Sequence, residues 1–160
     1  MKYIQIKPCF IAGIAIALTV LSSINNPSCA ATPSDIETPA EATVKLYSKI
    51  SARDLDGVMQ LIPPEGFNEI GVGANVVHRI DKQALGVFFK SDLTINLRAI
   101  DVAAQEFGDT TIVTGTRVGS IAPNGVQAKE DRHQFTMVWT KTNNRWLLRH
   151  VHLSEVKSIH

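Results

Sequence analysis

The feature that most constrains the fold is a change in hydrophobic period near residue 93. Before it, apolar residues recur at helical spacing. From there to residue 156 they alternate with polar residues, which is typical of strands. The four alternating runs are Leu93–Glu106, Thr110–Ile121, Val126–Lys141 and Arg145–Val156. Short links rich in Gly, Asn and Asp join them and suit hairpins, so this half of the chain is predicted to be an antiparallel meander.

Three helices are predicted before the strands. The first begins at Thr38, whose side chain can form a capping box with Glu41, and a proline occupies the first helical position. Asp54 can cap a second short helix that two prolines end, and Asp81 can cap a third. Helices followed by antiparallel strands predict an α+β fold, with the helices packed on one face of the sheet.

Residues 1–30 have the order of a secretory signal peptide. Lys2 and Lys7 precede an apolar stretch over residues 9–24, and small residues follow, so cleavage is expected after Ala30. The apolar stretch is shorter than the ~20 residues that a membrane span needs. A periplasmic or secreted protein is therefore expected. The alternative is a lipoprotein with lipid on Cys29, although Asn26 stands where a lipobox usually has Leu.

The remaining 31–160 would form a flexible lead over 31–37 and one domain over 38–157. Both cysteines lie within the first 30 residues, so no disulfide or thiolate site is expected in that domain. Without Lys2 and Lys7, fourteen basic residues stand against fifteen acidic ones, a net charge of −1. No basic excess attracts nucleic acid or anionic lipid. Neither a cofactor nor stable membrane insertion is expected.

Two segments carry a resemblance to a known family. The last strand holds Trp146, Leu148, His150, His152 and Ser154, and residues 73–85 read G-x-x-x-V-H-R-I-D-K-Q-A-L. In these motifs and in its layout the chain resembles the nuclear transport factor 2-like superfamily. It is most similar to the SnoaL-like branch and to the association domain of calcium/calmodulin-dependent kinase II. The resemblance implies a cone with one pocket, in which a curved antiparallel sheet wraps around three N-terminal helices.

Arg117 is the strongest candidate for a ligand contact. It follows the run 112–116 on a strand expected to be central. The resemblance matches it to an arginine that lines the pocket of the kinase association domain and faces acidic ligands. A guanidinium offers a fixed fork of donors to a carboxylate or an enolate-like oxygen. The alternative is that Arg117 pairs with an acid on a neighbouring strand or points outward.

His150 and His152 are two residues apart and are expected on one strand face with Leu148 and Ser154. Imidazoles there could donate to a ligand carbonyl or remove a proton, because they titrate near neutral pH. The alternative is a structural role in the core. No metal site is expected, since no carboxylate or third histidine stands at ligand spacing, although His133 could approach the pair.

His133 alternates with Phe135, Met137 and Trp139 on the third of the four strands. If that face is inward, His133 lies toward the pocket mouth and the other three form a wall of the ligand site. The alternative is that these three are ordinary core residues.

Asp101 is the acid set in the otherwise apolar stretch A-I-D-V-A-A. Apolar surroundings can raise the pKa of a carboxyl and suit it to general acid or base catalysis. A salt bridge to Arg117 or Arg98 explains the residue equally well.

Two functions remain open, because the resemblance covers enzymes as well as binding and oligomeric domains. The first is a binding domain that forms a homodimer through the convex sheet face and holds a small, partly apolar molecule, acidic or uncharged. The second is a cyclase, isomerase or dehydratase in which a pocket histidine moves a proton and Arg117 stabilises an oxyanion. The lack of a complete catalytic set favours the first. One bulge in a strand would change which residues face the pocket.

Overall fold

The computed structural model describes residues 37–156, so the predicted signal peptide and residues 31–36 of the predicted lead lie outside the described residues. The elements are α1 (Pro39–Ser51), α2 (Leu55–Met59), β1 (Phe67–Ile70), β2 (His78–Ile80), α3 (Lys82–Phe89), β3 (Leu93–Phe107), β4 (Thr110–Pro123), β5 (Asp131–Thr142) and β6 (Arg145–Glu155). The predicted α+β order of helices and long strands is confirmed.

Each helix begins where a side-chain oxygen replaces the missing backbone acceptor. At α1, the Thr38 backbone N–H donates to a Glu41 carboxylate oxygen at 2.8 Å, and the Glu41 N–H donates to the Thr38 hydroxyl at 3.3 Å. Asp54 accepts from the Gly57 N–H at 2.8 Å, and Asp81 accepts from the Ala84 N–H at 2.9 Å. The three predicted caps are confirmed, because capping depends on residues only three positions apart.

The strands form one six-stranded sheet with the order β2-β1-β6-β5-β4-β3. The predicted meander from β3 to β6 is antiparallel throughout. The expectation of an entirely antiparallel sheet was wrong in one pairing, because β1 runs parallel to β6 with Asn68 opposite His150. The segment 67–80 before α3 thus supplies two short strands, β1 and β2. These strands pair with each other, and β1 also pairs with β6, which lies far away in the sequence. The residues of the segment alone therefore do not predict them. β5 also begins at Asp131, later than predicted.

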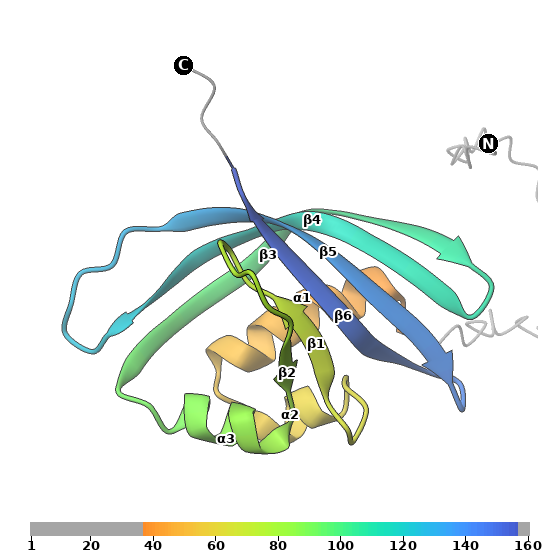
Figure 1. Cartoon of the computed structure of the whole chain (residues 1–160), viewed down its shortest axis with the longest axis horizontal. Helices are drawn as coiled ribbons and strands as arrows, with labels where there is room; N and C mark the ends of the chain where they lie inside the picture. Colours follow the sequence, from red (N-terminus) through yellow and green to blue (C-terminus); the bar gives the residue numbers. More distant parts are fainter. Residues whose placement is uncertain (1–36, 157–160) are drawn as a thin grey trace, which may run out of the picture. The chain divides into compact units, whose positions relative to one another are not determined.

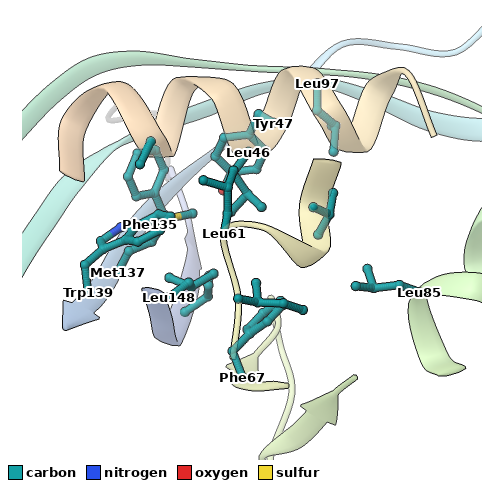
Figure 2. Close-up of a cluster of buried hydrophobic side chains, with 14 of the residues drawn as sticks. Leu46, Tyr47, Leu61, Phe67, Leu85, Leu97, Phe135, Met137, Trp139 and Leu148 are labelled. Carbon is teal, nitrogen blue, oxygen red and sulfur yellow. The ribbon is translucent and has the colours of Figure 1, made fainter. Parts of the chain in front are cut away.

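All three helices lie on the same side of the curved sheet, while no helix of residues 37–156 covers its other face (Figure 1). The core forms between α1 and the inner sheet face. Figure 2 shows Phe135, Met137 and Trp139 grouped beneath α1, from which Leu46 and Tyr47 point toward them. Trp139 is fully buried and Phe135 nearly so. Burying an apolar side chain of this kind stabilises the fold by about 1.5–3 kcal/mol.

Two bulges bend the sheet and decide which side chains face the helices. In β3 the pairing with β4 shifts between Ile100 and Ala103, and Asp101 lies there with φ of 53°. In β6, Leu148 pairs with Trp139 and His150 pairs with Val138. Arg149 is therefore the extra residue of the second bulge. Beyond it, the alternation of inward-facing and outward-facing side chains along β6 is shifted by one residue.

Leu148 is completely buried on the inner face, whereas His152 and Ser154 are exposed on the outer face and His150 is half-buried. The prediction that Leu148 shares a face with the two histidines was wrong. A regular strand would have kept them together, but one extra residue reverses the alternation. The part of the chain that the structure describes contains no helix that is both long and apolar enough to cross a membrane.

Candidate functional site

A cavity of about 340 Å³ lies between the helices and the inner sheet face. Its walls come from α1, α3 and all six strands, and twelve of its fifteen lining residues are apolar. The three others are Tyr47 on α1, Glu69 on β1 and Arg117 on β4. A largely apolar hollow of this size with a few convergent polar groups has the usual composition of a small-molecule site.

Arg117 contributes its guanidinium to this cavity. Its Nη2 lies 2.9 Å from Nδ1 of His133, its cross-strand neighbour on β5. None of the ion pairs within residues 37–156 includes Arg117, so no described carboxylate lies within 4.0 Å of it. Arg117 thus lines the cavity and forms no ion pair with an acid of a neighbouring strand within residues 37–156. Most of its five N–H donors remain available to a ligand.

His133 is the side-chain hydrogen-bond partner of the Arg117 guanidinium. An arginine can only donate hydrogen bonds, so the facing Nδ1 must accept and the neutral ring carries its proton on Nε2. Burial lowers the pKa of His133 and the Arg117 charge lowers it further, while Asp131 and Glu155 act in the opposite direction. The neutral ring is therefore the favoured state at neutral pH, and it orients Arg117.

Glu69 is a cavity residue that the sequence analysis did not single out. Burial raises the pKa of its carboxyl, although the charges of Arg117 and His78 partly oppose this. No salt bridge or side-chain hydrogen bond joins Glu69 to another residue of 37–156. The sequence did show an acidic residue between apolar ones, in Phe67–Ile70. Four residues are too few for the alternation of a strand to be recognised. An unpartnered carboxyl in a largely apolar cavity is a chemically active feature.

Tyr47 was expected only as part of the apolar stripe of the first helix. Its ring is buried and packs against Phe135 with centroids 5.8 Å apart, while the residue also lines the cavity. Burial raises the pKa of its phenol, which Arg117 lowers and Glu69 raises further. The phenol is therefore neutral and can donate a hydrogen bond into the cavity.

The other predicted site residues divide between the two sheet faces. Met137 lines the cavity, whereas Phe135 and Trp139 are core residues that do not line it. Met137 is thus both core and wall. Other apolar residues complete the cavity wall, including Leu85 and Phe88 of α3.

Asp101 and His152 lie on the outer face, in an open depression that also involves Ser154. This placement is a correction for His152, a candidate ligand contact, and His150 does not line the cavity either. Asp101, a candidate acid or base, is not a cavity residue. Asp101 is exposed, and Arg98, one of its expected partners, pairs with Glu130 at 2.9 Å. The bulges at 101 and 149 account for the change of face. Within residues 37–156, no three or more His, Cys, Asp or Glu side chains are grouped so that they could hold a metal ion.

Solved structures share this architecture. The CaMKII hub of S. rosetta is 26% identical, covering 74% of this chain and 98% of its own, with a TM-score of 0.57. An NTF2-like protein of unknown function in nutrient uptake from Rhodospirillum rubrum is 22% identical over 74% and 98%, with a TM-score of 0.61. A suspected dehydratase of the NTF2-like family from Streptomyces avermitilis is 18% identical over 78% and 97%, with a TM-score of 0.61.

The last two likenesses show the fold alone. No curated protein matches the sequence significantly. The family model described as the SnoaL-like domain matches residues 40–157, which includes every element that surrounds the cavity. On this match the chain belongs to the SnoaL-like domain family, and its fold is that of the solved NTF2-like proteins.

Proposed function

We propose that the domain binds a small, largely apolar molecule that carries an acidic or strongly hydrogen-bond-accepting group. The observation that supports this most directly is the pairing of an apolar cavity with the Arg117 guanidinium, whose side-chain partner is the neutral His133. An apolar body would displace water from the walls near Leu85 and Met137. Its polar end would meet donors that no described carboxylate neutralises.

A thermal-shift panel tests this proposal. Hydrophobic carboxylates and sulfonates that fit the cavity, each beside its uncharged alcohol analogue, are added to the wild type and to Arg117→Leu. A ligand at a hundred times its Kd stabilises the folded state by about 2.7 kcal/mol. The acids are expected to raise the Tm of the wild type more than the alcohols do. Arg117→Leu is expected to remove this preference while keeping some response to both.

Two matched controls locate the binding. Ala84→Phe puts a ring into the cavity, whereas Val87→Phe puts the same ring on the exposed side of the same helix. The first should abolish the response and the second should leave it unchanged. His152→Ala is expected to have no effect, because His152 lies on the outer face. Stabilisation that survives Ala84→Phe would place the ligand elsewhere and reject the proposal.

A second function, proton-transfer catalysis of the isomerase, cyclase or dehydratase kind, is favoured by one observation. Glu69 is a half-buried carboxyl with a raised pKa, and it lines the same cavity as the Tyr47 phenol. Glu69 would remove a proton next to a ligand carbonyl, and Tyr47 or Arg117 would stabilise the oxyanion. This role replaces the one first expected for His150 and His152. Enzyme-dependent deuterium exchange next to the carbonyl of apolar ketones, lost in Glu69→Gln, would support it. No exchange with any cavity-sized ketone leaves binding as the function.

Export is proposed as well, on the charged, apolar and small-residue order of residues 1–30. N-terminal sequencing of the protein recovered from periplasm or medium checks it. A mature chain beginning at Ala31 is the expected result. A chain that begins at Met1, or one that carries lipid on Cys29, would contradict cleavage after Ala30.

A further inference from the structure

Two groups of opposite charge face one cavity without pairing. Arg117 projects from β4 and Glu69 from β1, strands that are separated in the sheet by β6 and β5. They influence each other electrostatically, yet no nitrogen of Arg117 lies within 4.0 Å of a Glu69 oxygen. Two groups that could have formed a salt bridge are instead held apart across a hollow. A ligand in this hollow is therefore exposed to both.

We propose that Glu69 is a charge-selecting residue, which admits an anionic ligand to Arg117 in its protonated form and repels that ligand in its ionised form. This inference rests on the proposed function, because it concerns a ligand in the same cavity. A protonated carboxyl adds a hydrogen-bond donor beside the guanidinium, whereas a carboxylate places a like charge in a poorly screened space. Where Glu69 is ionised in the unliganded protein, binding of the anion is then accompanied by uptake of up to one proton at Glu69.

Because the pKa of Glu69 is raised, the change between its protonated and ionised forms occurs closer to neutral pH than for an exposed glutamate. Burial is the main cause, and a bound anion would raise the pKa further because it disfavours the carboxylate. By linkage, the affinity for the anion is highest below the pKa of Glu69 in the unliganded protein. It falls as the pH rises from that pKa toward the higher pKa in the complex, by at most about tenfold per pH unit, and it levels off above the pKa in the complex. An uncharged ligand of the same shape gains much less from protonation.

Other titratable groups near the cavity are distinguishable from Glu69. His78 on β2 is the cross-strand neighbour of Glu69 on β1, and His133 contacts Arg117 with Asp131 and Glu155 nearby. Protonation of a histidine would also favour an anion at low pH. His133→Asn keeps an acceptor for Arg117 but removes the imidazole, and His78→Gln removes the imidazole next to Glu69. Tyr47 stays neutral across the range, because burial raises its pKa.

The test uses two dyes that share one aromatic body. 8-Anilinonaphthalene-1-sulfonate is an anion at every working pH, and N-phenyl-1-naphthylamine is the same molecule without the sulfonate. Fluorescence titrations give Kd for both dyes between pH 5 and pH 8, in the wild-type protein and in Glu69→Gln, His133→Asn and His78→Gln. Ala84→Phe reports any dye bound outside the cavity. Circular dichroism confirms that each variant is folded at each pH.

For the wild type, the Kd of the sulfonate is expected to rise about tenfold or more from pH 5 to pH 8, while that of the neutral dye changes less than about twofold. Glu69→Gln should bind the sulfonate at pH 8 about as tightly as at pH 5. His133→Asn and His78→Gln should keep the rise. Sulfonate binding that is independent of pH in the wild type, or that keeps its full pH dependence in Glu69→Gln, overturns the inference alone. Failure of both dyes to bind in the cavity overturns the proposed function, and the inference with it.

Discussion

Glu69 and Arg117 are unusual because both are ionisable residues that line a largely apolar cavity. Ionisable side chains in such surroundings normally form ion pairs. His133 relieves part of this cost at Arg117 by accepting one hydrogen bond at 2.9 Å. Glu69 has no such relief among residues 37–156, and burial therefore favours its neutral form. A fold that maximised stability alone would place an apolar residue at position 69.

The first prediction concerns this cost. The folded-state pKa of Glu69 is raised, so the unfolded chain loses the proton first as the pH increases. Its contribution is fully favourable below the unfolded value near 4.5 and is lost as the pH rises through the folded value. Glu69→Gln should match the wild type in Tm at pH 4 and exceed it increasingly toward pH 7. Thermal melts in matched buffers measure this. A difference in Tm that does not vary with pH would contradict the raised pKa.

At the scale of the elements, the bulges in β3 and β6 have the largest effect on the site. Gly115 lies opposite the β3 bulge, and a Cβ built there would come within 2.6 Å of the Phe135 ring and 3.0 Å of the Ile100 carbonyl oxygen. The missing side chain lets the aromatic core approach the bend in the sheet. The curvature and the core packing therefore depend on one another at this point.

The second prediction tests that close approach. Gly115→Ala should destabilise the fold by about 1–3 kcal/mol, because Phe135 is buried and cannot move away freely. Gly86→Ala is the matched control, since its new Cβ would have Leu55 at 3.9 Å as its nearest neighbour and lies in helix α3. It should stabilise the fold by up to about 1 kcal/mol. Urea denaturation of both variants gives the comparison, and equal effects would show that the contact is not constraining.

The third prediction concerns the backbone of the β3 bulge. Asp101 has a positive φ of 53°, which glycine adopts without cost and a β-branched residue adopts poorly. Asp101→Gly should be neutral or stabilising by up to about 1 kcal/mol, whereas Asp101→Val should destabilise by at least about 1 kcal/mol. Both are measured by urea denaturation. If Val is tolerated as well as Gly, the bulge is not held in this conformation in solution.

At the scale of the whole domain, the helices cover one sheet face and leave the other uncovered by any helix of residues 37–156 (Figure 1). That outer face carries a cross-strand row of Thr114, Thr136 and His152. A homodimer through this face remains a proposal. The homodimer is supported by the small threonine side chains of this row, which allow two sheets to approach each other closely.

The fourth prediction examines this dimer. Thr136→Glu places a charge at the centre of the row, and Val87→Glu places the same charge on exposed α3, away from the sheet. Light scattering after gel filtration should give a dimer for the wild type and for Val87→Glu, and a monomer for Thr136→Glu. A monomeric wild type at micromolar concentration would end the proposal. A Thr136→Glu protein that remains dimeric would move the interface to another face.

The helix starts and the long strands could be predicted because their causes are local. Thr38 and Asp81 act on backbone groups three residues away, and alternation from residue 93 onward needs only neighbouring residues. Arg117 was singled out by its place after the run 112–116 on an expected central strand and by the family resemblance, and it lines the cavity. Glu69 was missed because β1 has four residues and exists through pairing with β6, about 80 positions later in the chain.

By itself, the sequence determined the α+β order, the capped helices and the antiparallel meander, since each depends on side chains close together along the chain. Only the tertiary structure decided which residues face the cavity. A strand with period two can present either set of side chains to the core, and one extra residue exchanges them. The bulge at Arg149, held by Thr140 and Glu65, makes that choice in β6 and turns His152 away from the hollow that Glu69 and Arg117 share.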